Sequence, residues 1–214
     1  MGNVDIRAAK RITPTNQSQM NNLQSNEYID LLVAQGLPAY TELTRIGASW
    51  ATMSTAAVAG LVVRPGVVAA FEIYNPSTSG VSLIIDRLFW FNLVSTNVVE
   101  GFSGWAQVTT PNRVAAAPTS GSFTVRGNSG NAYGGAVIAA ASTSVVDSGW
   151  FPWGNAYQKG AGGVVPFGAL SADVQGRLIV QPGGSLCLHV VSSLVGQTFT
   201  QGASWFERAL THIN

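Results

Sequence analysis

Charged residues are scarce in this sequence of 214 residues. They make up 10% of the chain, against 46% hydrophobic residues, whereas a soluble globular domain usually carries about 25% charged residues. The formal net charge of +1 gives little repulsion between copies and no field that would attract nucleic acid. We therefore expect an assembly that buries surface between copies. A monomer coated with Ser, Thr, Asn, Gln and Gly is the alternative.

Cysteine and histidine are nearly absent as well. One cysteine and two histidines exclude an internal disulfide and any Cys/His metal cluster. Cys187 and His189 lie in the apolar run SLCLHVV, which predicts a buried thiol and a core or interface histidine. The ten carboxylates are scattered, and no nucleophile elbow or phosphate-binding loop occurs. We expect no metal, no cofactor and no enzyme.

Long apolar segments are also missing. The longest uncharged apolar stretch, AAVAGLVV, is too short to span a bilayer, and the first residues lack the apolar centre of a signal peptide. These features predict a protein made in the cytoplasm, without a membrane partner.

Residues 1–40 are predicted to form an N-terminal arm. Its first 25 residues are polar and aperiodic, and a short helix is predicted over 26–36, between Asn26 as N-cap and Gly36 as C-cap. Arg7, Lys10 and Arg11 make the arm weakly basic. Three charges are too few for strong nucleic-acid binding, so a solvated tail is the expectation from charge, and contact of these three residues with a capsid is a candidate role.

The rest of the chain, 41–214, consists of short Val-, Ile-, Phe- and Trp-rich runs separated by turn signals such as NPSTSG and QPGG. This spacing predicts an all-β fold, a jelly-roll β-sandwich with an extended N-terminal arm and one short helix. Strands are predicted at 43–53, 57–63, 67–75, 81–95, 103–110, 121–126, 136–147, 163–166, 176–181, 185–194 and 201–209.

Two predicted strands, SLIIDRLFWFNLVS and SLCLHVVSSLV, are apolar on both alternating faces. An antiparallel sheet with one face in water alternates apolar and polar residues, so both strands need a second cover, either the helix or a neighbouring subunit. The predicted oligomer interface consists of Ile84, Leu88, Trp90, Cys187, His189 and Val191.

The letters GASW occur twice, at 47–50 and 202–205. In a jelly roll the first and last strands are neighbours, so these two segments are predicted to pair antiparallel with Trp50 and Trp205 packed over small residues. A chance match between common residues is the alternative.

Aromatic residues gather in SGWFPWGNAYQKG, which predicts a loop that presents Trp150, Phe151, Trp153 and Tyr157. Such rings can stack on sugars or anchor a protein partner. The alternative is that the tryptophans close one end of the sandwich or pack between subunits.

Three segments together resemble phage virion proteins that consist of an arm followed by a jelly roll: TELTRIGASW, VVAAFEIYNPSTSGVSLIIDRLFWFNLVS and RLIVQPGGSLCLHVVSSLVGQTFTQGASWFER. The resemblance covers about residues 41–209. It implies a tumour-necrosis-factor-like jelly roll that forms a homotrimer and acts as a capsid decoration (cement) protein in the virion, with the capsid protein as partner. Attachment of the arm to the shell is our extrapolation.

Two other functions remain open at this point. The aromatic segment fits a glycan-binding module of a phage tail or spike, with host glycans as partners. A jelly roll is also a common fold of principal capsid subunits, although the weakly basic arm counts against that function.

Overall fold

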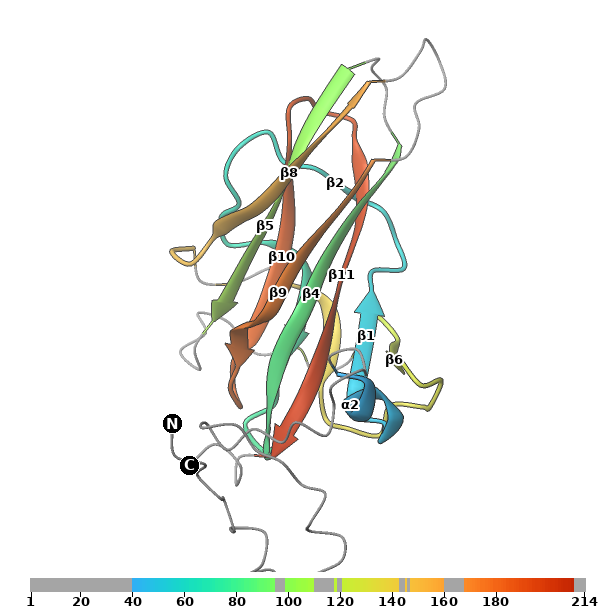
Figure 1. Cartoon of the computed structure of the whole chain (residues 1–214). Coiled ribbons are helices and arrows are strands. Elements are labelled where there is room, and N and C mark those ends of the chain that lie inside the picture. The colour runs from blue at the N-terminus through green and yellow to red at the C-terminus, as the bar shows by residue number, and fades with distance from the viewer. Residues whose placement is uncertain are drawn as a thin grey trace, which may run out of the picture. The chain divides into compact units, whose positions relative to one another are not determined.

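The computed structural model (Figure 1) describes residues 40–94, 99–109, 118, 121–142, 145, 147–159 and 168–209. The chain divides into two compact units, Met1–Glu42 and Leu43–Asn214, and the sandwich belongs to the second. The described elements are α2 (Thr41–Arg45), β1 (Ser49–Met53), β2 (Val58–Ala59), β3 (Ala69–Tyr74), β4 (Val81–Val94), β5 (Val99–Thr109), β6 (Val125–Gly127), β7 (Ile138–Ser142), β8 (Phe151–Lys159), β9 (Ala169–Val180), β10 (Ser185–Ser192) and β11 (Thr198–Ala209).

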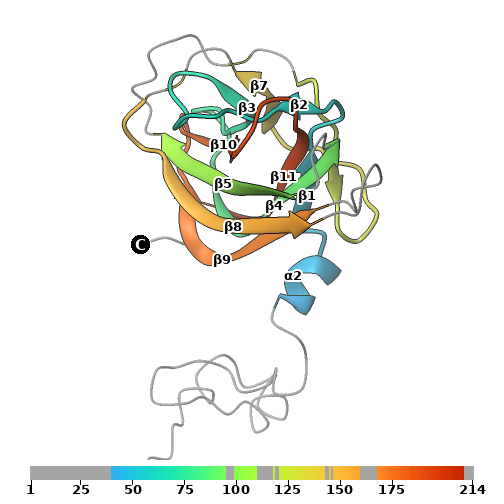
Figure 2. The same cartoon turned by 90° about the horizontal axis from the view of Figure 1, so that it is seen from above.

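The strands form two antiparallel sheets. The six-stranded sheet has the order β6-β1-β11-β4-β9 with β2 beside β11, and the five-stranded sheet has the order β7-β3-β10-β5-β8. From β3 to β5, and again from β8 to β11, consecutive strands alternate between the sheets, which is the double Greek key of a jelly roll. In the view from above, β8 and β9 lie side by side where the sheets meet at one edge (Figure 2). The predicted all-β jelly-roll sandwich is confirmed.

The first and last strands of the sandwich are neighbours, as the doubled GASW predicts. β1 and β11 pair antiparallel, with Trp50 directly opposite Trp205. Both indoles are buried in the core between the sheets. Small residues lie opposite each other in the next rows, Ala51 beside Ser204 and Thr52 beside Ala203.

The segment before β1 corrects a predicted boundary. A strand was predicted from residue 43, but Thr41–Arg45 is helical and β1 begins at Ser49. The helix ends in a Schellman motif, because Ala48 N donates to Leu43 O and Gly47 N donates to Thr44 O. Gly47 takes a φ of 76°, a left-handed conformation that glycine adopts without steric cost.

A β-bulge at Asp86 interrupts the regular alternation of faces that the sequence predicts for β4. Ser204 lies opposite Arg87 and Trp205 opposite Ile85, so Asp86 is the extra residue, and the register with β9 shifts at the same place. Before the bulge, Leu83 and Ile85 point into the core; after it, Leu88 and Trp90 do. A regular alternation places these two pairs on opposite faces. The bulge puts them on the same face.

The chain itself covers β10 on both sides. Leu186, Leu188 and Val190 face the other sheet in the main core. On the opposite side, Cys187 packs with Trp150 and Val145 in a second apolar cluster. This cover is held by Trp150 Nε1, which donates to Gly66 O at 2.7 Å, and by Arg64, whose guanidinium contacts Asp147 Oδ1 at 2.7 Å.

Other boundaries differ as well. β2 and β6 are shorter than the runs predicted there, and β9 begins at Ala169 rather than 176. The predicted helix over 26–36 and the predicted strand over 163–166 lie outside the described residues.

Candidate binding surfaces

The outer face of the six-stranded sheet is the first candidate surface. Residues opposite each other on paired strands share a face, so this face carries one row of Ser49, Phe206, Ile84 and Ile179, and another of Met53, Gly202, Phe89 and Ser171. Phe91 and Leu93 continue it along β4. Met53, Leu93 and Ile179 are 39–43% exposed. An outer sheet face in water is normally polar, whereas the exposed part of this face is apolar at Met53, Leu93 and Ile179, and Ser49 and Phe206 are buried.

Most charges on the outer face lie in one row between the apolar rows. Arg126, Ala51, Ser204, Arg87 and Asp173 lie side by side in it. Arg87 Nε contacts Asp173 Oδ1 at 2.7 Å, and the bulged Asp86 accepts a 3.5 Å hydrogen bond from Ser204 Oγ. The two arginines and two aspartates of this row balance, and Arg208 adds one positive charge two residues beyond Phe206 on the same face of β11.

Four of the six predicted interface residues are buried by the chain itself, which corrects that prediction. Leu88 and Trp90 lie in the main core, while Cys187 and His189 lie beneath the Trp150 cover. A side chain without exposed area cannot contact a partner. Ile84 is half-buried on the outer face, and Val191 is half-buried on the other sheet.

The predicted aromatic loop is a strand. Phe151–Lys159 form β8, the edge strand of the five-stranded sheet, and Trp150 directly precedes it, so the four aromatic side chains separate. Trp150 is 4% exposed and belongs to the cover of β10, whereas Phe151 is 66% exposed at the start of the strand. Trp153 is half-buried against the core, with the Arg177 guanidinium 5.6 Å from its ring centre. Tyr157 is 71% exposed.

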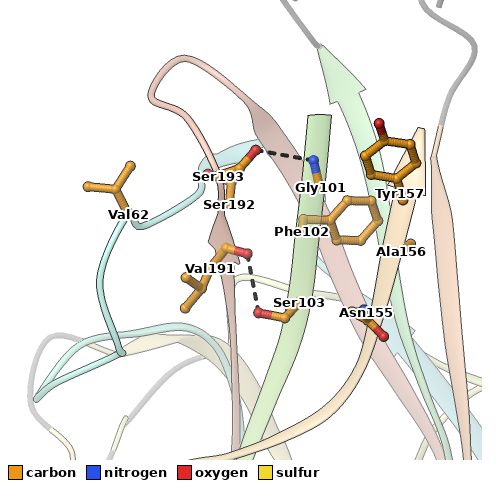
Figure 3. Close-up of a pocket in the computed structure, with 10 residues that line it drawn as sticks. All are labelled: Val62, Gly101, Phe102, Ser103, Asn155, Ala156, Tyr157, Val191, Ser192 and Ser193. Carbon is orange, nitrogen blue, oxygen red and sulfur yellow. Dashed lines mark hydrogen bonds between the residues drawn. The ribbon is translucent and has the colours of Figure 1, made fainter. Parts of the chain in front are cut away.

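The second candidate surface is an open groove beside Tyr157, which we call the Tyr157 groove (Figure 3). It has a volume of about 450 Å³ and crosses β10, β5 and β8 on the outer face of the five-stranded sheet. Gly101 lies directly opposite Tyr157, so the ring has no side chain facing it across the strands. The lining residues are Val62, Gly101, Phe102, Ser103, Asn155, Ala156, Tyr157, Val191, Ser192 and Ser193.

Polar groups along the Tyr157 groove are held in place by the backbone and by Trp105. Ser193 Oγ accepts a 3.1 Å hydrogen bond from Gly101 N. Ser103 Oγ accepts one of 2.8 Å from Trp105 Nε1, and its own contact to Val191 O is long, at 3.4 Å. Each hydroxyl oxygen is therefore held in place by the hydrogen bond that it accepts. The hydroxyl group of Ser193 can still donate a hydrogen bond to a ligand.

His189 has a structural environment. Its ring lies 6.5 Å from that of Trp150, edge to face, and Val190 N donates to Nδ1 at 2.9 Å. Burial lowers the pKa of His189 below its ordinary value, and the carbonyl oxygen of Val190, 3.2 Å from Nδ1, opposes that shift in part. The imidazole is therefore neutral at physiological pH.

The described residues include no group of three or more His, Cys, Asp or Glu side chains that could hold a metal ion. Within the same residues, no helix is long and apolar enough to cross a membrane. Arg7, Lys10 and Arg11 lie outside the described part of the chain.

Sequence reasoning missed most of the Tyr157 groove. Ser103 lies in β5, Asn155 in β8 and Ser193 directly after β10, and the polar residues among them were not predicted to act together. Of the lining residues, the sequence singled out Tyr157 as an aromatic recognition residue and Val191 as an interface residue.

Comparison with models of known protein families found no match. Comparison with curated proteins found no match either.

Proposed function

We propose that this protein is a structural virion subunit, a jelly-roll capsid decoration protein that assembles as a homotrimer and strengthens a phage shell. The virion setting and the trimer come from the resemblance of residues 41–209 to phage jelly-roll proteins. The fold agrees with that resemblance, because the sandwich has jelly-roll strand order.

The outer face of the six-stranded sheet is the observation that carries this proposal. Ile84, Phe89 and Phe91 are half-buried there, with Leu93 and Ile179 more exposed. Covering these side chains would stabilise an assembly by about 25 cal/mol for each Å² of apolar area removed from water. Exposed apolar patches of this kind mark interaction sites.

A second copy of the chain is the occupant that fits this face. The charges of its central row balance, so the row adds no net repulsion between copies, and the chain as a whole has few charges. A cyclic trimer uses two different surfaces of each subunit, and the outer face supplies one of them. Decoration then acts by adding buried area between capsid subunits rather than by chemistry.

Light scattering on the purified full chain tests the assembly. A homotrimer gives about three times the chain mass of 22.4 kDa. Ile179→Glu places an unpaired charge on the outer face and is expected to yield monomers. The matched control is Val195→Glu, because Val195 is exposed in the turn between β10 and β11, away from this face.

A monomer at all concentrations would refute the trimer, and loss of assembly in the control as well would refute the role of the outer face. The virion setting has a separate test. Mass spectrometry of purified phage particles from a culture that carries the gene should find this chain in the particle. Its absence from the particles would refute the decoration role.

A further inference from the structure

We propose that the Tyr157 groove binds a neutral carbohydrate, through stacking of one pyranose ring on Tyr157. This inference is independent of the assembly proposed above. The groove lies on the five-stranded sheet, whereas the proposed interface lies on the six-stranded sheet.

The Tyr157 ring is presented as a flat, open surface. On a sheet, an aromatic side chain normally packs against the residue opposite on the next strand. Here that residue is Gly101, and even a Cβ added to it would lie 3.8 Å from Tyr157 Cδ2. The space that a side chain would fill is part of the groove (Figure 3). The C–H face of a pyranose fits such a ring, since it is flat, apolar and of similar size.

Asn155 supplies a polar group beside the ring. It lies two residues before Tyr157 on β8, on the same face of the strand. Within the described residues neither the Asn155 amide nor the Tyr157 hydroxyl has a hydrogen-bond partner. A planar amide offers both a donor and an acceptor, which matches two adjacent hydroxyl groups of a sugar.

The hydroxyls of Ser103 and Ser193 lie across the groove from β8. Their oxygens are already fixed by Trp105 and Gly101, so little side-chain entropy is lost when a ligand binds. Val191 and Val62 add apolar surface at the floor and the far side. A few placed polar groups on an apolar lining are typical of small-molecule sites, and about 450 Å³ is within their usual range.

The lining favours an uncharged ligand. None of the ten described residues that line the groove is charged at neutral pH. A sialylated or sulfated glycan would lose solvation of its anionic group without gaining an ion pair. Neutral hexoses and N-acetylhexosamines avoid that cost.

The test begins with an array of immobilised glycans that carries neutral hexose, neutral N-acetylhexosamine and sialylated oligosaccharides. We expect the full chain to bind neutral glycans, and calorimetric titration with the best free neutral disaccharide then compares variants. Tyr157→Ala should weaken binding about tenfold or more, whereas Tyr157→Phe should retain it within about threefold. Gly101→Val should abolish binding by filling the groove, because Gly101 has no left-handed φ that would strain the variant.

Phe151→Ala is the matched control. It removes an equally exposed ring from the same strand, outside the groove, and should leave affinity unchanged. Near-ultraviolet circular dichroism verifies that each variant is folded, and light scattering on the same samples reports assembly separately. The proposal is overturned if no neutral glycan binds, if only anionic glycans bind, or if folded Tyr157→Ala and Gly101→Val bind as the unaltered chain does.

Discussion

Trp50 and Trp205 lie directly opposite each other on β1 and β11, 155 positions apart in the chain. Both indoles are buried between the sheets, and Trp205 has no exposed area at all. Among the five residue pairs that join the first and last strands of the sandwich, this is the one in which both side chains are tryptophans buried in the core, so we expect it to contribute strongly to the stability of the six-stranded sheet.

Trp205→Ala should therefore lower the free energy of unfolding by about 3–5 kcal/mol, the usual cost of removing a buried tryptophan. Urea unfolding followed by circular dichroism measures it. Phe151→Ala, which removes an exposed ring, should change stability by no more than about 0.5 kcal/mol. Equal effects of the two substitutions would contradict this assignment of the core.

Gly104 permits close packing of β5 over Trp90. A Cβ at this position would lie 2.5 Å from Trp90 Cδ2, and the indole is fully buried. Gly104→Ala should cost about 1–3 kcal/mol because the ring cannot move aside freely. Gly66→Ala is the control, since a Cβ there meets nothing within 4 Å; it should be neutral or slightly stabilising in the same urea titration.

His189 predicts how stability depends on pH. Its pKa is lowered by burial in the folded state, so below about pH 6.5 the unfolded chain binds a proton that the folded chain resists. The contribution of neutral His189 to the free energy of unfolding should be fully present above about pH 6.5 and should be lost as the pH falls below 6.5.

His189→Gln should flatten this pH dependence, whatever its effect on absolute stability, and His212→Gln should keep it. Urea midpoints at several pH values measure both variants. An unchanged slope in His189→Gln would show that another group is responsible.

Tyr133 ties the β6–β7 segment to β11. Its hydroxyl donates a 2.7 Å hydrogen bond to Glu207 Oε1 and accepts one of 3.1 Å from Val137 N, while its ring packs edge to face on Trp50. Tyr133→Phe keeps the ring but removes both bonds, and should cost about 1–3 kcal/mol.

Tyr133 also predicts how stability depends on pH in the alkaline range. Burial, with the Glu207 carboxylate next in importance, raises the pKa of Tyr133. The contribution of Tyr133 to the free energy of unfolding is therefore fully present below about pH 10, and it should fall above that pH as the tyrosine of the unfolded chain ionises. Tyr133→Phe should reduce that loss, and an identical high-pH slope in the variant would refute the assignment.

The sequence predicted those parts of the fold that local turn signals or a repeated segment indicate. Turn signals between short apolar runs predicted the sandwich, and the doubled GASW predicted the neighbouring strands β1 and β11. The pattern failed at Asp86, because counting alternate residues assumes an unbroken strand, and one inserted residue exchanges the two faces.

Long-range contacts explain the other differences. The cover over Cys187 comes from segments near Gly66 and Trp150, so the apolar outer side of β10 did not require a second subunit. The Tyr157 groove depends on a missing side chain at Gly101 beside residues of two other strands. No sequence period reports such an arrangement.

The position of β11 between β1 and β4 has a consequence for biosynthesis. After β1 leaves the ribosome, the edge that pairs with β11 stays without its partner strand until about 150 further residues have been translated. An unpaired strand edge is an aggregation hazard. Slow closure from such distant contacts is expected. Expression at low temperature or with chaperones should therefore raise the yield of native protein.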